Sequence, residues 1–426
     1  MKINISAAAT ALVICFCLSG TMLSGKDDEF REVTAFNSKL PIYHKNRLQF
    51  VVSCKTMQRQ AEKINATDAV IDIIRKGANI DRIQYLNVLV PYPLGAPLPT
   101  VVDFWKDRLY SEAIISSSSA QIDQENKTAN GTEKVYLRSP ALDLNGIGFL
   151  ANYDKHTVLV RKDVNIVVRL AVAQTRNLTA KTLKQAKDDV VRITSETLFV
   201  DFDKNLITLQ GKVRINEARF SIDSDEVQLL LSGNEDNNKK NVASDEESQI
   251  QGVSKVTCIG NVVITKTVGA DELQKAGEQK ATAGKAVYEV KEGQIVLTEN
   301  RPQIKRGNDT VSGSKITIWK ETERMLVEKD GKIVVTVPRK DKKTGKPEAN
   351  KTPTIVFADF MDINYGKNIA TLTGNVKVDD TMLKLDCHKM TIYLEDAKNQ
   401  GKKTEPAVDA KNIADDGLDF NRIAKS

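Results

Sequence analysis

Two stretches of this sequence decide the fold: TLFVDFDKNLITLQGKVRINEARFSIDSDEVQLLL at residues 197–231 and FMDINYGKNIATLTGNVKVDDTMLKLDCHKMTIYL at residues 360–394. They align without a gap at an offset of 163 residues, which places Gly211 on Gly374 and brings identical Lys-Asn and Thr-Leu pairs together. A match of this length indicates that the chain repeats one structural unit.

Apolar side chains alternate in the same phase in both copies. In the first copy they are Leu198, Val200, Phe202, Leu209, Val213 and Ile215, and in the second Met361, Ile363, Tyr365, Leu372, Val376 and Val378. A period of two is typical of a strand with one buried face. Further on, the alternation steps by three, from Ser224 to Val227 and from Cys387 to Met390, which predicts a bulge or bend in each copy.

Further copies of the pattern occur elsewhere in the chain. Residues 286–300, AVYEVKEGQIVLTEN, repeat the strand, charged turn and strand, with Tyr288 before the turn and Ile295 and Leu297 after it. Residues 149–168 have the same form, and a partial copy at residues 256–264 places Cys258 among the predicted core residues. Because one strand pair cannot bury its own apolar face, the copies must stack on each other, as in a solenoid or an extended jelly roll.

The composition supports strands and excludes several classes of protein. Of the 426 residues 41% are hydrophobic and only 5% aromatic, so the core must consist of Val, Ile and Leu, which suit a pleated surface. The net charge of +6 is spread along the chain, with no basic stripe interleaved with aromatic residues, and this argues against a nucleic-acid partner.

The N-terminus predicts export. An uncharged segment from Ile3 to Gly25 follows Lys2 and ends at charged residues, as in a signal peptide. We expect it to be cleaved; the alternative is an uncleaved anchor in the inner membrane, because its length approaches the roughly 20 residues that span a bilayer. The rest of the chain is then expected on the far side of that membrane, in the periplasm.

Polar stretches divide the chain into predicted regions. After the signal or anchor at 1–25, we expect an N-terminal β domain at 26–177, a short connecting helix at 178–192 and a second β domain at 193–395. Two charged stretches inside the second domain, 232–248 and 338–353, predict exposed loops, and residues 396–426 predict a loose charged tail. The fold class is therefore all-β, with one short helix.

The sequence gives little support for catalysis, a metal or a cofactor. His44, His156 and His388 are the only histidines and show no metal-ligand spacing. His388 is beside Cys387, but the strand phase predicts a buried cysteine and an outward histidine. We found no phosphate-binding glycine loop and no recognisable pair of carboxylates, so we expect no enzyme, and a hydrolase of cell-wall polymers is disfavoured.

Residues 281–327 resemble the OstA-like family of lipopolysaccharide-transport proteins of the LptA type. The shared pattern consists of Ala283, Ala286 and Tyr288, then Val296, Leu297, Thr298 and Asn300, then Gly313, Ile316, Ile318, Trp319 and Met325. The resemblance extends over about 193–395, and about 40–190 is more weakly similar to the LptC type. Glu299 replaces the usual glycine. The resemblance implies one or two V-shaped β-jelly rolls that hold lipid acyl chains between their sheets and join end to end.

These observations together predict a periplasmic scaffold that binds lipopolysaccharide in an apolar groove. Its expected partners are lipopolysaccharide, other jelly-roll transport proteins that pair through strand edges, and an inner-membrane transporter complex. The predicted groove residues are Leu198, Val200, Phe202, Leu209, Val213, Ile215, Tyr288, Ile295, Leu297, Met361, Ile363, Leu372, Val376 and Val378. The alternative is a structural β-solenoid or adhesin-like envelope protein in which the same side chains close a dry core.

Overall fold

The computed structural model of the chain shows only β-strands in the residues that it describes. These residues are 33–44, 47–74, 111–123, 125–139, 142–152, 154–169, 190–217, 220–231, 253–266, 279–336 and 353–393. Every pair of neighbouring strands in this part is antiparallel, which confirms the predicted all-β fold of jelly-roll type. The contacts divide the chain into two compact units: Met1–Ala218 with Glu226–Ser254, and Arg219–Asp225 with Lys255–Ser426.

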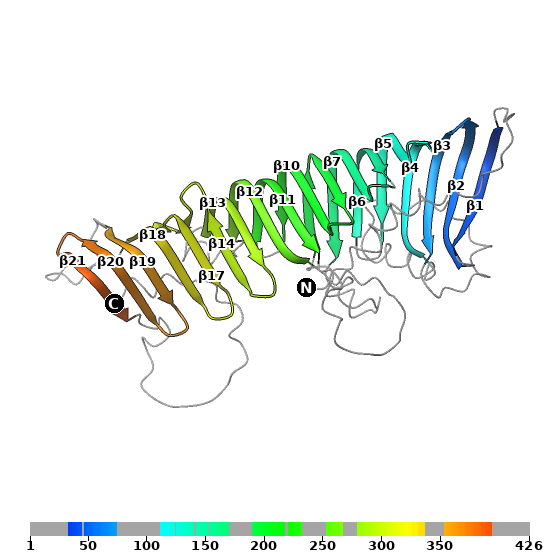
Figure 1. Ribbon diagram of the computed structural model, residues 1–426. Helices are drawn as coiled ribbons and strands as arrows, with labels where there is room; N and C mark the ends of the chain where they lie inside the picture. Colours follow the sequence, from blue (N-terminus) through cyan, green and yellow to red (C-terminus); the bar gives the residue numbers. More distant parts are fainter. Residues whose placement is uncertain are drawn as a thin grey trace, which may run out of the picture. The chain divides into compact units, whose positions relative to one another are not determined.

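Unit 1 contains ten strands that follow each other in chain order (Figure 1). They are β1 Val33–His44, β2 Arg47–Gln60, β3 Lys63–Ile74, β4 Ser111–Asp123, β5 Thr128–Arg138, β6 Leu142–Asn152, β7 Thr157–Arg169, β8 Val190–Ser195, β9 Thr197–Asp201 and β10 Leu206–Asn216. The short strands β8 and β9 together act as one long strand, because β7 and β10 pair with both of them. The predicted boundary between two β domains lies inside this unit.

Unit 2 is built in the same way after β11 Phe220–Leu231, whose residues are divided between the units. Its strands are β12 Val253–Lys266, β13 Gln279–Glu289, β14 Gln294–Thr298, β15 Gln303–Arg306, β16 Asp309–Ser312, β17 Lys315–Trp319, β18 Arg324–Val335, β19 Thr354–Asn364, β20 Ile369–Asp379 and β21 Lys384–Tyr393. Here β14 with β15, and β16 with β17, each take the place of one long strand.

Most long strands bend near their middle, where the pairing register shifts. The shift lies between Thr373 and Val376 on β20, and between Ile259 and Val262 on β12. Two residues with positive φ occupy each of these bends, for example Gly374 and Asn375 with φ of 77° and 47°. Two such residues turn a strand sharply. Each unit therefore consists of two half-sheets, which meet along the line of these bends. The step of three from Cys387 to Met390 on β21 lies opposite this shift of β20, so the bulge predicted in this copy is present, with its extra residue on β20.

Glycines occur at these bends because a carboxylate of the preceding strand lies over them. A Cβ at Gly374 would lie 2.4 Å from Asp359 Oδ2, and one at Gly260 would lie 2.3 Å from Asp225 Oδ2. The following asparagine donates a hydrogen bond to the same carboxylate oxygen: Asn375 Nδ2 to Asp359, 2.9 Å. The Gly-Asn pairs at 260–261 and 374–375 thus set the bends of their strands.

The turns between strands use one repeated hydrogen bond. An Asp or Asn side chain at the strand end accepts the backbone N–H three residues further on, as from Lys204 to Asp201 (3.0 Å) and from Lys367 to Asn364 (2.8 Å). The last turn residue has a positive φ, which asparagine tolerates well, as Asn368 does at 55°. This explains why the Lys-Asn pair coincides in the two copies.

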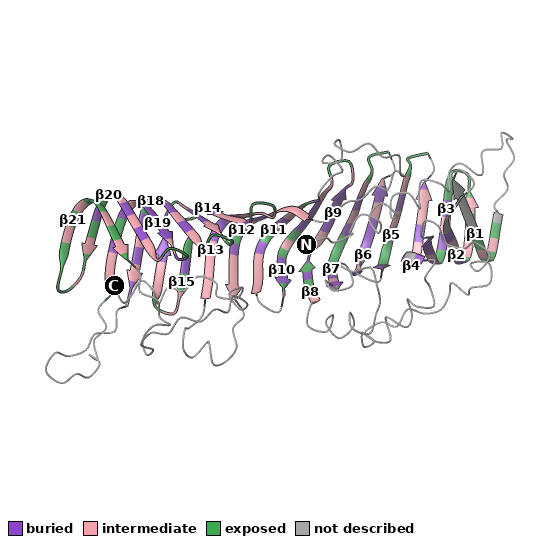
Figure 2. Ribbon diagram, turned by 90° about the horizontal axis from the view of Figure 1, so that it is seen from below, coloured by how far each residue is buried: buried purple, intermediate pink, exposed green. Residues whose placement is uncertain are grey.

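Burial follows the predicted alternation along each strand (Figure 2). The largest fully buried side chains include Leu209, Met361, Ile363 and Leu372, all with no exposed surface. Strand β21 has no buried residue, and among the described strands it pairs with β20 alone. The core of each unit therefore lies between its half-sheets and thins out at β21.

Two predictions need correction. The connecting helix was predicted to end at residue 192, but residues 190–192 already belong to strand β8. β-Branched Val190 and Val191 favour a strand there, and their pairing with β7 overrides the helical pattern. Cys387 is half-buried rather than buried, because no further strand covers β21. The signal segment, the remainder of the helix, the loop at 232–248, nearly all of that at 338–353, and the tail lie outside the described residues.

Candidate functional site

The predicted groove residues all lie on the described strands or their turns, and most of them are buried. Ten are less than a tenth exposed: Leu198, Val200, Leu209, Val213, Ile215, Leu297, Met361, Ile363, Leu372 and Val376. Four are half-buried: Phe202, Tyr288, Ile295 and Val378. The predicted groove residues are therefore mostly buried, and solvent reaches only the four half-buried ones.

A sealed row of side chains runs across the first half-sheet of unit 2. We define this half-sheet by β14, β17 and the parts of β13 and β18–β20 that pair with them: 285–289, 324–328, 360–364 and 369–373. The pairing places in one row Leu297, Ile316, Val327, Met361 and Leu372. None of them is more than 1% exposed, so this row is a dry core.

The neighbouring row of the first half-sheet is open at one end. Tyr288, Ile295 and Ile318 are direct cross-strand neighbours and half-buried. Further along the same row, Met325 and Ile363 have no exposed surface. The accessible part of this row lies beside the turns of β13, β14 and β17.

In the second half-sheet of unit 2, burial also changes along the inward row. We define it by β15, β16 and the parts of β13 and β18–β21 that continue them: 279–282, 332–335, 354–357, 376–379 and 384–387. Its inward row contains, in order, Ala281, Ile304, Val311, Ile333, Val356, Val378 and Leu385. The central members are buried and both ends are half-buried. Sequence reasoning missed Ile304 and Val311, because their strands have four residues each and are too short to show a period, and it also missed Ile333 on β18.

On the first half-sheet of unit 2 and the adjoining strand β12, charged residues of the outward face form cross-strand ion pairs: Lys255 with Glu289 (2.7 Å), Lys315 with Glu328 (2.6 Å) and Arg324 with Asp362 (2.8 Å). The inward rows contain none. This division between faces creates a continuous apolar interior suited to hydrocarbon.

The buried cysteine confirms how dry that interior is. Cys258 is 3% exposed and lies beside Ala286 in the sealed row, and burial raises the pKa of its thiol to about 11. Among the described residues, no three His, Cys, Asp or Glu side chains are grouped to hold a metal ion. His156 pairs with Asp203 at the surface, 2.9 Å apart. The described ranges also contain no helix that is long and apolar enough to span a membrane.

Comparison with known proteins identifies part of the chain. Residues 192–324 match the family described as LptA/(LptD N-terminal domain) LPS transport protein. Among solved structures, LptH of Pseudomonas aeruginosa, described as the LptA-homologous periplasmic component of the lipopolysaccharide transport device, matches at 14% identity and a TM-score of 0.25. The match covers 39% of this chain and 93% of LptH. No curated protein matches. The resemblance to the OstA-like family is thus confirmed over residues that include both half-sheets at β13–β17.

Proposed function

We propose that this chain is a periplasmic component of lipopolysaccharide transport that holds lipid acyl chains between its half-sheets. The observation that carries the proposal is the match of residues 192–324 to a lipopolysaccharide-transport family, over strands whose inward faces are mostly apolar. Transport by such a scaffold is passive: the lipid moves along an apolar lining while its polar head stays in water.

The burial gradient suggests where lipid enters. Half-buried apolar residues, Tyr288 and Ile295 on one half-sheet and Val378 on the other, offer contact without rearrangement. Passage over the sealed row requires the half-sheets to separate, since Leu297 and Met361 leave no free surface. The groove is therefore proposed to open when lipid or a partner binds.

The end strand β21 is the proposed docking edge for a partner jelly roll. Its outer edge has no partner among the described strands, and the adjoining Met382, Leu383 and Tyr393 are 72%, 54% and 71% exposed. An unpaired edge next to exposed apolar side chains is well suited to addition of a strand from another protein. The many charged residues of β21 would protect this edge from aggregation while it is free.

Photo-crosslinking in Gram-negative cells tests the groove. A benzophenone amino acid at Tyr288, Ile295 or Val378 is expected to form lipopolysaccharide adducts, detected as shifted bands with an anti-lipopolysaccharide antibody. The matched controls are Phe360 and Phe199, which are 46% and 37% exposed on strands that also carry groove residues, but point outward. Adducts of equal strength at inward and outward positions, or none at inward ones, would refute the groove.

A second candidate function follows from the sealed row. If Leu297, Ile316 and Met361 stay packed at all times, the chain is a structural envelope protein with a closed core and no lipid ligand. The same crosslinking distinguishes the two: a closed core predicts protein adducts alone from every probe, the inward ones included.

A further inference from the structure

The bend of unit 2 between β14 and β15 has three positive-φ residues in place of two. At Glu299–Arg301, between β14 and β15, three successive residues without glycine have positive φ: 63°, 50° and 52°. Backbone hydrogen bonds hold this bend on both sides, from Gly284 N–H to Glu299 O (2.9 Å) and from Gly313 N–H to Pro302 O (3.2 Å). Residues kept in such a sparsely populated conformation are frequently found at functional sites. This bend presents the side chain of Arg301 to two cavities on the outward side of the second half-sheet.

The smaller cavity is suited to an anion. Its volume is about 250 Å³, and it is lined by Arg301, Gln303, Thr310, Ser312, Lys332 and Val334. The register explains how they meet: Gln303, Ser312 and Lys332 are successive cross-strand neighbours, and Thr310 lies opposite Val334. Two cations and three neutral hydrogen-bond donors converge there, and no carboxylate lines the cavity. Arginine with lysine and hydroxyl groups is the usual set for a phosphate or carboxylate.

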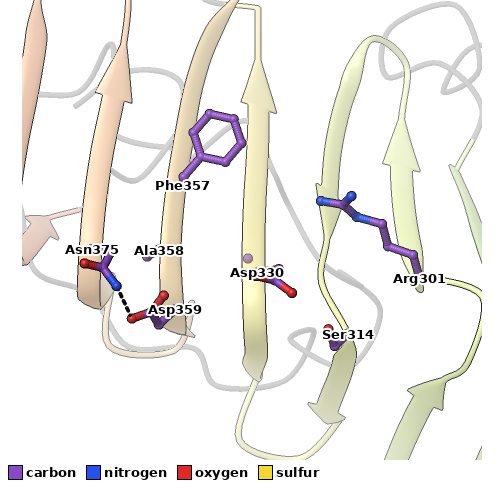
Figure 3. Close-up of a pocket in the computed structure, with 8 residues that line it drawn as sticks. Arg301, Ser314, Asp330, Phe357, Ala358, Asp359 and Asn375 are labelled. Carbon is purple, nitrogen blue, oxygen red and sulfur yellow. Dashed lines mark hydrogen bonds between the residues drawn. The ribbon is translucent and has the colours of Figure 1, made fainter.

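The larger cavity adjoins the smaller one at Arg301 and is suited to a sugar (Figure 3). Its volume is about 610 Å³, and it is lined by Arg301, Ser314, Asp330, Gly331, Phe357, Ala358, Asp359 and Asn375. The Phe357 ring is 38% exposed and can stack on a sugar ring. Asp330 and Asp359 can accept hydrogen bonds from sugar hydroxyl groups, and Ser314 can donate one.

The cations here differ from those on the first half-sheet. There Lys315 pairs with Glu328 at 2.6 Å and Arg324 pairs with Asp362 at 2.8 Å. The described residues supply no ion-pair partner for Arg301 or Lys332; the Lys332 ammonium instead lies 5.5 Å from the centre of the Phe357 ring. Two unpaired cations beside a donor-lined cavity can bind an anion without first breaking an internal ion pair.

We propose that these joined cavities bind a sugar that carries an oxyanion, such as a sugar phosphate. The anion occupies the smaller cavity between Arg301 and Lys332, and the sugar ring lies on Phe357 with its hydroxyl groups toward Asp330 and Asp359. The site faces outward and does not include the apolar groove. Its test is therefore independent of the test of the lipid-transport proposal.

Binding of glucosamine 1-phosphate to the full chain, followed by line broadening in phosphorus NMR at low salt, tests this site. We expect saturable binding that is weakened about tenfold in Arg301→Gln and in Lys332→Gln, because each removes one charge-assisted contact. Phe357→Ala should weaken the sugar phosphate but not inorganic phosphate. Glucuronate, followed by competition, shows whether a carboxylate serves as well as a phosphate.

The matched control is Lys377→Gln. Lys377 is the cross-strand neighbour of Phe357 on the same face and is exposed, but it lines neither cavity, so binding should change less than about twofold. An equal loss in this variant would mean diffuse attraction to positive charge and overturn the site. Equal affinity for inorganic phosphate and the sugar phosphate would overturn the sugar part of the proposal. Absence of saturable binding would overturn it entirely.

Discussion

At the scale of single residues, the bends depend on glycine for two separate reasons. Gly374 has a φ of 77°, which costs any other residue except Asn or Asp roughly 1–2 kcal/mol. In addition, its missing side chain leaves room for the Asp359 carboxylate. The repeat of this arrangement at Gly260 and Asp225 shows that both requirements belong to the fold rather than to one position.

Substitution of a bend glycine is therefore expected to destabilise its unit. Gly374→Ala should lower the free energy of unfolding by about 2 kcal/mol, measured by urea denaturation, because the new methyl group meets Asp359 and the backbone conformation becomes strained. Gly366→Ala is the matched control, since its Cβ would find its nearest neighbour at 3.5 Å, an ordinary contact. It should change stability by less than about 0.5 kcal/mol. Equal effects of the two substitutions would contradict this account of the bend.

The three cysteines of the described residues should differ in reactivity. Cys54 and Cys258 are buried, and burial raises the pKa of both thiols, which lowers the fraction of reactive thiolate. Cys387 is half-buried on the end strand. Iodoacetamide labelling followed by mass spectrometry should modify Cys387 first, and Cys258 only after unfolding in urea. Labelling of native Cys258 as fast as Cys387 would show that the interior is not dry.

At the scale of elements, the sequence predicts strands well and three-dimensional neighbours poorly. The period of two and the alignment of the copies identify β9, β10, β19, β20 and β21, because alternation reports directly which face is buried. The Arg301 site could not be found in this way. Its residues come from the connections at Arg301 and Ser314 and from five strands, so they meet only once the register between β15, β16, β18, β19 and β20 is known. The groove residues were located, but how far they are sealed depends on packing between the half-sheets.

The end strand β21 should open more easily than the strands inside its unit. It carries no buried side chain, whereas β19 buries Val356, Ala358, Met361 and Ile363. Hydrogen exchange followed by mass spectrometry is expected to be at least about tenfold faster in β21 than in β19. A partner that adds a strand at this edge would slow exchange in β21 specifically. Equal protection of the two strands in the isolated chain would argue against a free edge.

At the scale of the whole molecule, stacking of repeated strands predicts that stability is local. Each strand contacts its direct neighbours, so a defect should spread only a short way along the stack. Gly374→Ala should accelerate hydrogen exchange in β18–β21 of unit 2 and leave β1–β5 of unit 1 unchanged. Gly211→Ala, whose Cβ would lie 2.5 Å from Glu196 Oε2, should have the reverse effect, with faster exchange in β7–β10.

This pair of variants also bears on how a lipid carrier can open. If stability is local, the half-sheets of one unit can separate over a sealed row such as that of Leu297 and Met361 while the other unit stays folded. Exchange that rises equally in all strands of both units after either substitution would show a single cooperative structure. Separation of the half-sheets in one unit would then require both units to unfold. The closed-core alternative would become the better account of the protein.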